Sequence, residues 1–359
     1  MLIFLIVILG LSFLILSHEA GHFLVGKAFG LKIDEFGFGF PPRIFAWTPR
    51  QAQGAHKGEK GETEYSLNWL PFGGFVRIAG ENDGMVKDDL AAGLTDEEKK
   101  RIFAFQPAWK RAAVMLAGVT VNFLTGWLLL SAVLMIGTPK ALVISNVQKG
   151  SPAEQIGLMS SDVVKGFTDS QSFIQFVNSN KGKQISITIT RNNKDMTFSV
   201  VPRVNPPPGE GSIGVELADA GTGRESFFPA LWDGIRESVI IVGMTFQAFY
   251  QLLVGLVTRA TLAPGIVGPV GIFSVAEETG KIGLIYLAQL LALISLNLTV
   301  VNLIPFPALD GGRFFMVIIE KIKGSPISRK VESAVNTAGF AFLILLMLAL
   351  TVRDVSHWF

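Results

Sequence analysis

The sequence predicts a polytopic α-helical membrane protein with four membrane-spanning helices and one inserted polar domain. Of its 359 residues, 49% are hydrophobic and 17% are charged, and the mean hydropathy is +0.45. Charged residues make up about a quarter of an average soluble protein. Long apolar runs alternate with polar stretches, and one polar stretch has the pattern of β-strands. The net charge of +2 gives no support for a nucleic-acid partner, so none is expected.

Four apolar runs are long enough, or nearly long enough, to cross a bilayer, which takes a helix of about 20 residues. They cover residues 2–25, 114–136, 282–304 and 338–352. The first run has no basic leading segment and no small-residue cleavage site, so we expect it to be retained as a span. A fifth uncharged run, 239–257, contains two glutamines. It could span the membrane or lie on its surface as an amphipathic helix.

The basic residues predict how the chain is oriented. Thirteen Lys or Arg lie in residues 27–111, and none precedes Lys27. Basic residues concentrate in cytoplasmic loops, so we expect residues 27–111 in the cytoplasm and the N-terminus outside. The second span then runs outward and places residues 139–224 outside the cytoplasm. Within that segment Ile185, Ile187 and Ile189 alternate with polar residues, which predicts a half-buried strand.

The strongest functional signal is a His-Glu-x-x-His motif formed by His18, Glu19 and His22. On a helix, positions i and i+4 share one face, so the two imidazoles can bind one zinc ion. Glu19 lies beside them, where it can act as general base toward a water molecule at the metal. The chain has no Cys and only four His, so half of its imidazoles fall in this motif. Ionisable side chains inside an apolar helix are costly and mark function.

A catalytic zinc site usually has three protein ligands and one open position. His56 lies in a loop rich in Gly and Lys and His357 lies in the tail, and both suit a solvated side chain. Asp310 is the better third ligand because it closes an apolar run, after prolines that interrupt the helix. The alternative is an ordinary Asp-Gly turn.

The path of the chain links this third ligand to the count of spans. If residues 239–257 crossed the membrane, the third span would run outward and Asp310 would lie on the side opposite to the His pair. If they lie on the surface, the third span runs inward and Asp310 meets His18 and His22. The metal hypothesis therefore predicts four spans.

Together these motifs resemble those of bacterial site-2 proteases, most closely the RseP-like branch. The resemblance covers nearly the whole chain and rests on the motif in the first span, on the Asn-x-x-Pro-x-Pro-x-x-Asp-Gly run that begins at Asn302, and on the polar domain between them. Residues 65–80, with Gly73 and Gly74, resemble the re-entrant β-hairpin of the family, and residues 118–122 resemble its GxxxN motif. The implied fold is a polytopic α-helical membrane protein with four transmembrane helices, a membrane re-entrant β-hairpin and one inserted extracytoplasmic PDZ domain.

The implied PDZ domain has its own sequence signal. The segment 150–158 followed by Asp162 resembles a PDZ domain of the bacterial protease type, covering residues 140–203. Ser161 stands where such domains usually have Gly. RseP itself carries two PDZ domains, whereas this chain has room for one. We expect the domain to filter or dock substrate ends by strand addition, with a rigid spacer as the alternative.

The expected division of the chain follows from these assignments. It comprises the first transmembrane helix (1–26), a cytoplasmic and re-entrant β region (27–111), the second transmembrane helix (112–137), the PDZ domain (140–203), a linker with a membrane-surface helix (204–281), the third transmembrane helix with the second motif (282–312), and a cytoplasmic loop, fourth transmembrane helix and tail (313–359).

The resemblance also implies roles for individual residues. His18, His22 and Asp310 would bind Zn²⁺, and Glu19 would be the catalytic base. Asn302 would be a second catalytic residue, at the reacting carbonyl. The implied substrate-binding residues are Asn297, Asn122, Gly73 and Gly74. For Asn302 and Asn297 the alternative is a hydrogen bond between helices, and for the glycines it is a tight turn.

The implied function is that of an intramembrane zinc metalloprotease. Its substrates would be single-span membrane proteins, of the anti-sigma factor or signal-peptide type, in the lipid bilayer of a bacterial inner membrane. The active site would lie near the cytoplasmic face. One alternative is a catalytically inactive membrane PDZ scaffold. Another is a zinc or ion transporter, which the scarcity of ionisable residues in the other spans disfavours.

Overall fold

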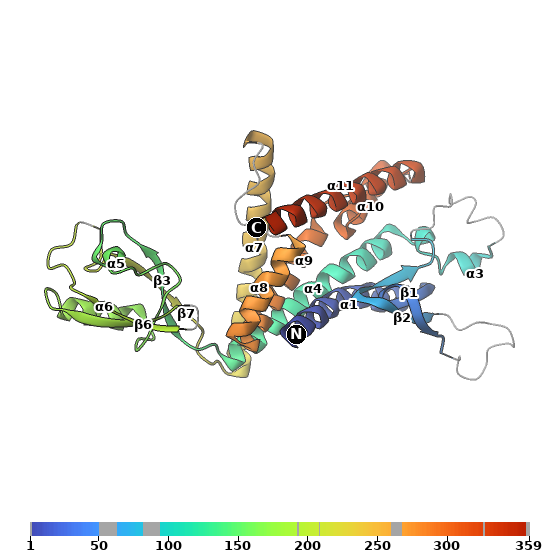
Figure 1. Ribbon diagram of the computed structural model, residues 1–359. Helices are drawn as coiled ribbons and strands as arrows, with labels where there is room; N and C mark the ends of the chain where they lie inside the picture. Colours follow the sequence, from blue (N-terminus) through green and yellow to red (C-terminus); the bar gives the residue numbers. More distant parts are fainter. Residues whose placement is uncertain are drawn as a thin grey trace. The chain divides into compact units, whose positions relative to one another are not determined.

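The structure is a computed structural model that describes residues 2–49, 63–81, 94–191, 194–207, 209–259, 268–325 and 327–356, shown in Figure 1. His56 and His357 lie outside the described residues. The chain forms two compact units. The membrane unit comprises Met1–Ala132 and Leu231–Phe359, and the inserted unit comprises Val133–Ala230.

Four helices in the described part of the chain are long and apolar enough to cross a membrane. They are α1 (Leu2–Ala28), α4 (Ala108–Ile136), α9 (Leu284–Leu303) and α11 (Arg329–Ser356). The four predicted spans are confirmed at this level of length and composition. Helices α4 and α11 start before the apolar runs predicted for them. In each helix, the first turns carry basic residues and the apolar run follows. The run 239–257 lies within the 33-residue helix α7 (Phe227–Arg259), which is not among the four.

Small residues allow three of these helices to pack closely. A Cβ atom on Gly21 of α1 would lie 2.6 Å from the carbonyl oxygen of Ala117 on α4. Likewise, a Cβ atom on Gly126 of α4 would lie 2.7 Å from Leu296 of α9. Without a hydrophobic drive between helices in lipid, such close backbone packing stabilises their association. The contact at Gly21 brings α4 against the helical turn that carries the His-Glu-x-x-His motif.

A two-stranded antiparallel hairpin follows α1. It consists of β1 (Ile33–Trp47) and β2 (Glu64–Ile78). Gly73 has a φ of +81°, and a Cβ atom there would lie 2.8 Å from Ile15 of α1. A Cβ atom on Gly74 would lie 2.6 Å from the carbonyl oxygen of Gly37. In this structure the two glycines therefore let β2 lie against both α1 and β1.

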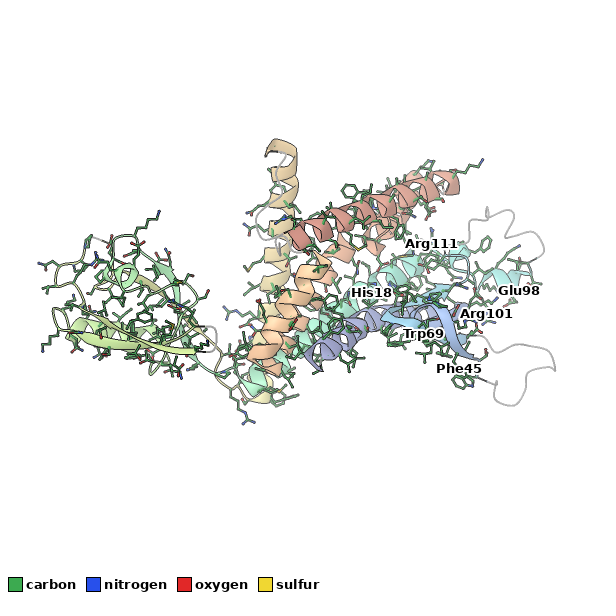
Figure 2. The ribbon with its side chains drawn as sticks, viewed as in Figure 1. His18, Phe45, Trp69, Glu98, Arg101 and Arg111 are labelled. Atoms are coloured by element: carbon green, nitrogen blue, oxygen red, sulfur yellow. The ribbon has the colours of Figure 1, made fainter. Side chains whose placement is uncertain are left out.

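The hairpin presents many large apolar side chains on its surface. Figure 2 shows two of them, Phe45 and Trp69, which are 61% and 67% exposed. Among the hairpin side chains that the structure describes, the exposed large apolar ones are Phe40, Ile44, Phe45, Trp47, Leu67, Trp69 and Leu70. An apolar cluster of this size is unusual on a protein surface facing water and indicates an apolar environment or a partner.

The C-terminal part of α11 forms hydrogen bonds with the start of α8 (Pro269–Ile282). Asp354 of α11 accepts hydrogen bonds from the backbone N–H groups of Gly268 and Gly271, at 3.2 and 2.8 Å. A carboxylate here satisfies amides that the first turn of a helix leaves without partners. A Cβ atom on Gly268 would lie 2.6 Å from this carboxylate, which accounts for a glycine at that position.

The inserted unit contains a five-stranded antiparallel sheet with strand order β6-β5-β4-β3-β7. Its strands are β3 (Ala141–Val147), β4 (Val163–Val164), β5 (Ile185–Arg191), β6 (Lys194–Val200) and β7 (Val215–Ala220). Two helices accompany the sheet, α5 (Pro152–Gln155) and α6 (Ser170–Ser179). Strand β7 pairs with β3, so the sheet takes in residues beyond the expected end at residue 203.

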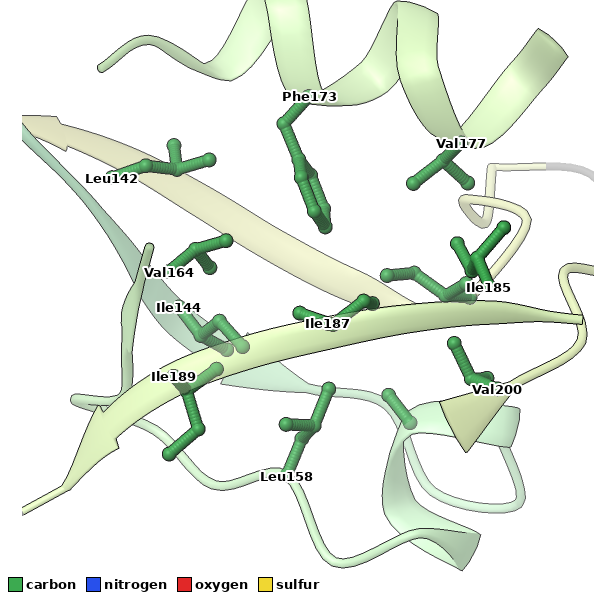
Figure 3. Packing of buried hydrophobic residues seen from close by; sticks show 12 residues of the cluster. Leu142, Ile144, Leu158, Val164, Phe173, Val177, Ile185, Ile187, Ile189 and Val200 are labelled. Carbon is green, nitrogen blue, oxygen red and sulfur yellow. The ribbon is translucent and has the colours of Figure 1, made fainter. Parts of the chain in front are cut away.

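The core of the inserted unit lies between this sheet and its helices (Figure 3). Ile185, Ile187 and Ile189 of β5 are all buried there, which confirms the predicted alternation. Asp162 is buried and paired with Arg191 at 2.6 Å. Ser161 has a φ of +74°, a left-handed conformation that suits Gly better than a residue with a Cβ atom. This backbone requirement explains why Gly is usual at the position.

Replacing Phe173 with Ala should destabilise the inserted unit by about 3–5 kcal/mol, because it removes a ring from a closely packed core. Phe173 is 1% exposed, whereas its neighbour Ile174 on α6 is 49% exposed. Ile174→Ala is therefore the matched control and should change stability little. Protease resistance of the unit, followed against urea in the purified full chain, measures both variants. Equal sensitivity of the two would contradict the assigned core.

Candidate metal centre

Three possible metal ligands from opposite ends of the sequence meet in the membrane unit. His18 and His22 lie one turn apart on α1, and Asp310 is the first residue of α10 (Asp310–Lys323). Asp310 Oδ2 lies 3.0 Å from His18 Nε2 and 3.2 Å from His22 Nε2, and the two Nε2 atoms are 3.2 Å apart. Both imidazoles are buried, and Figure 2 shows His18 on α1.

The spacing of these three atoms fits a zinc ion. Ligand bonds of about 2.0–2.1 Å in a tetrahedral arrangement place neighbouring ligand atoms about 3.3 Å apart. The three distances here are 3.0, 3.2 and 3.2 Å. Apart from the imidazoles, Asp310 Oδ2 is buried and has no hydrogen-bond donor among the described residues. Two imidazoles and one carboxylate also form a common ligand set of catalytic zinc sites.

Helix α4 contacts the second nitrogen of each imidazole. His22 Nδ1 donates a hydrogen bond to the carbonyl oxygen of Val114 at 2.8 Å. His18 Nδ1 lies 3.1 Å from the side-chain nitrogen of Asn122. Gly118, between them on the same helix face, leaves room for both rings. Sequence analysis found the imidazoles but could not find Val114, because its contribution is a backbone carbonyl that any residue supplies.

Glu19 is oriented by the hairpin. Its carboxylate oxygen Oε2 accepts a hydrogen bond from the backbone N–H of Val76 on β2 at 3.1 Å. The side chain is only partly buried. Because β2 packs on α1 through Gly73 and Gly74, the same contact that places the strand also fixes the carboxylate next to the His pair.

The turn that leads into Asp310 is held from two sides. Cβ atoms on Gly311 and Gly312 would lie 2.3 Å from the carbonyl oxygen of Ile304 and 2.1 Å from that of Phe306, so only Gly fits in this turn.

Helix α11 supports the turn from outside. Asn336 Oδ1 accepts a hydrogen bond from the backbone N–H of Ala308 at 3.2 Å, and Gly339 lets α11 approach Pro307. Sequence analysis missed Asn336 and Gly339, since neither lies in a recognisable motif.

Two ion pairs anchor α10 behind Asp310. Arg313 donates to Glu81, in the turn after β2, at 2.7 Å, and Arg111 of α4 donates to Glu320 at 2.5 Å. Burial raises the pKa of Glu81, although Arg313 lies against it. Both pairs are partly buried, so removing one partner would leave the other charge unpaired in a poorly solvated place, which is destabilising. These pairs therefore fix the direction of α10 and, with it, the position of Asp310.

The other predicted site residues lie in different surroundings. Asn297 Oδ1 accepts a hydrogen bond from Thr245 of α7 at 2.8 Å, the interhelical bond weighed above as the alternative. Asn302 is partly buried, and its side chain has no hydrogen-bond partner among the described residues. Asn122 is fully buried against His18. Gly73 and Gly74 are buried in the contact with α1 and β1.

The chain is similar to known zinc metalloproteases. The chain matches peptidase family M50 over residues 6–346. A protein of Clostridium perfringens (strain 13 / Type A) assigned as a zinc metalloprotease is 31% identical, over 97% of each chain. The Regulator of sigma-W protease RasP of Bacillus subtilis (strain 168) is 27% identical, over 96% of each chain. Zinc metalloprotease RasP of Oceanobacillus iheyensis is 26% identical, over 98% of each chain.

Replacing Gly118 with Ala should weaken zinc binding by about tenfold or more, the scale of effect seen when the surroundings of metal ligands are changed. The new Cβ atom would lie 2.5 Å from both His18 Cε1 and His22 Nε2 and would displace the rings. Gly243→Ala on α7 is the matched control, because its Cβ atom would have no neighbour within 4 Å. Zinc per chain after purification measures both. Full zinc content in Gly118→Ala would contradict the arrangement of α1 and α4.

Proposed function

The chain belongs to peptidase family M50 and is a zinc metalloprotease, and from this premise we propose that it hydrolyses peptide bonds within the membrane-spanning segments of single-span membrane proteins. The convergence of Asp310 with His18 and His22, at 3.0 and 3.2 Å, is the observation that carries the proposal. Two of these ligands lie in α1, a helix long and apolar enough to cross a membrane. A hydrolytic centre in that position suits substrates that are themselves in the bilayer.

Regulatory single-span proteins are the substrate class that we propose. The Bacillus subtilis relative is named as the regulator of sigma-W protease, which supports anti-sigma factors as one group. Remnants of signal peptides are a second proposed group of substrates, because each remnant, like the membrane part of a single-span protein, is one apolar helix. A peptide bond in such a helix is shielded by its own backbone hydrogen bonds, so the substrate has to be unwound before attack.

In the proposed mechanism the protein residues position water and move protons. Zinc, when bound, supplies a Lewis acid that polarises a carbonyl and lowers the pKa of water toward about 7. Glu19 takes the proton from the attacking water and later gives it to the leaving amine. The N–H of Val76 holds the Glu19 carboxylate in place for this transfer. Asn302, whose amide has no partner among the described residues, donates to the developing oxyanion.

We assign the β1–β2 hairpin as a re-entrant element that receives the unwound substrate. Its exposed aromatic and aliphatic side chains suit insertion into the apolar part of the membrane. A two-stranded sheet also leaves backbone groups at its edges, which can pair with an extended peptide. Since β2 contacts Glu19 through Val76, a peptide paired near this strand would lie close to the catalytic base.

For the chain as a whole we propose a multi-pass topology in a bacterial inner membrane, with the active site near the cytoplasmic face. The basic segment 27–111 supports a cytoplasmic location for the end of α1. Asp310 meets His18 and His22 from the end of α9, which is compatible with this topology if α7 lies on the outer membrane surface. Its exposed Phe228 and Trp232 suit a helix in contact with the interface.

We propose that the inserted unit is an extracytoplasmic PDZ domain that filters substrates. Its sheet has two edge strands, β6 and β7, and an exposed edge can add a peptide strand. Such a domain would admit substrates whose outer part is short and exclude those with a bulky outer domain.

The Glu19→Gln variant should lose cleavage by at least about a hundredfold, because the amide cannot accept the proton of the attacking water. Zinc content should stay at the wild-type level, since Glu19 is not one of the three ligands. A tagged single-span substrate coexpressed with the protein measures cleavage. Glu97→Gln, at a side chain that is 82% exposed, is the control and should cleave normally. Cleavage by Glu19→Gln at the wild-type rate would remove Glu19 from the mechanism.

A reporter enzyme that is active only outside the cytoplasm should be active when it is fused after Thr258, because we place α7 on the outer surface of the membrane. The same reporter fused after Lys323 should be silent, since α10 follows an inward-running α9. The two fusions together test the path of the chain. A cytoplasmic signal after Thr258 would show that α7 crosses the membrane and would overturn the proposed topology.

A further inference from the structure

One face of helix α4 contacts both imidazoles of the metal centre. Val114, Gly118 and Asn122 are spaced by four residues, so they lie in a row on this face. The row faces α1 where Gly21 allows its closest approach to α4. Val114 and Asn122 contact the Nδ1 atoms of His22 and His18, and Gly118 lies between the two rings. Val114 and Asn122 therefore meet the ring nitrogens that face away from Asp310, while Gly118 lies beside both rings.

The contact with Val114 fixes the tautomer of His22. A carbonyl oxygen can only accept a hydrogen bond, so Nδ1 must carry the proton. The lone pair of the neutral ring is then on Nε2, the atom that lies 3.2 Å from Asp310. This is the form of the ring that a metal ion at Nε2 requires.

The contact with Asn122 determines the tautomer of His18 in the same way. Asn122 is fully buried, its side-chain nitrogen lies 3.1 Å from His18 Nδ1, and its oxygen Oδ1 has no hydrogen-bond partner. Rotating the amide by 180° exchanges its oxygen and nitrogen. The oxygen then accepts from an N–H at Nδ1 and leaves the lone pair on Nε2. With the nitrogen donating instead, the proton would sit on Nε2 and exclude a metal ion there.

We propose that Asn122 is a positioning residue that accepts a hydrogen bond from His18 Nδ1–H and so keeps His18 Nε2 available to the zinc ion. It acts on the metal through His18 and does not contact the substrate. The inference rests on the proposed function in taking His18 as a zinc ligand. It differs from the role in substrate binding that the sequence motif implies for Asn122, and it explains why an Asn follows Gly118 by one helical turn.

The alternative is that Asn122 only joins helices. The structure offers a control for this alternative at the same residue. The hydroxyl of Ser295 on α9 donates to the backbone oxygen of Asn122 at 2.8 Å, and Ser295 is fully buried. Ser295→Ala thus removes a buried interhelical bond at the same point of α4 without touching the amide that faces His18.

The test compares zinc affinity across four variants of the full chain in detergent, by competition with a chromogenic chelator, and records the absorption spectrum of the cobalt-loaded protein. Asn122→Ala should bind zinc about 10–100-fold more weakly, the usual loss when a partner of a ligating His is removed. Asn122→Asp should bind within a few fold of the wild type, because a carboxylate can only accept from Nδ1–H. Ser295→Ala should keep the wild-type affinity and cobalt spectrum. His18→Ala should lose zinc.

Each result decides a separate point. Wild-type affinity in Asn122→Ala, or a loss of tenfold or more in Asn122→Asp, would overturn the role of Asn122. The Asp variant decides the matter even if the Ala variant fails to fold. An equal loss in Ser295→Ala would favour the purely structural role and would also overturn it. Undiminished zinc in His18→Ala would instead overturn the ligand set of the proposed function.

Discussion

The packing of the membrane unit brings one carboxylate into contact with two imidazoles inside a bundle of apolar helices. Such groups are costly to bury unless they are paired or bind an ion. Asp310, His18 and His22 lie 3.0–3.2 Å apart because α10 starts directly beside α1, and α4, which touches α1 at Gly21, contacts both rings. The close packing, the glycine-rich turn and the two ion pairs of α10 are therefore parts of one arrangement.

Sequence reasoning identified the elements whose signal is local. The apolar runs predicted four helices of spanning length, and the spacing of His18 and His22 predicted that they share a face. Asp310 was selected because His56 and His357 suit solvated positions and because a four-span path brings the end of the third apolar run to the His pair. The supports of these residues could not be predicted in the same way. The carbonyl of Val114 has no sequence signature, and the contacts of Gly118 and Gly73 depend on which helix or strand packs against them. Likewise, the hydrogen bond that Asn297 accepts from Thr245 of α7 depends on how α7 packs against α9, which the sequence does not show.

Each group at the centre depends on a different neighbouring element. Helix α4 supports the imidazoles, strand β2 holds Glu19, and α11 together with the anchors of α10 places Asp310. A displacement of any one element would therefore change the position of a specific chemical group. Because the support is divided over separate elements, the positions of these few side chains depend on correct packing of the whole membrane unit.

The support that α11 gives to the turn before Asp310 bears on how the protein is made. Asn336 reaches back 28 residues to Ala308, and Asp354, close to the end of the chain, caps α8. The N-terminal part of a chain is synthesised first, so α1 with its His pair is made before Asn336 and Asp354 can form their hydrogen bonds. The turn before Asp310 therefore gains this support only after α11 has been made. A chain without α11 would therefore leave the turn before Asp310 without its hydrogen bond to Asn336.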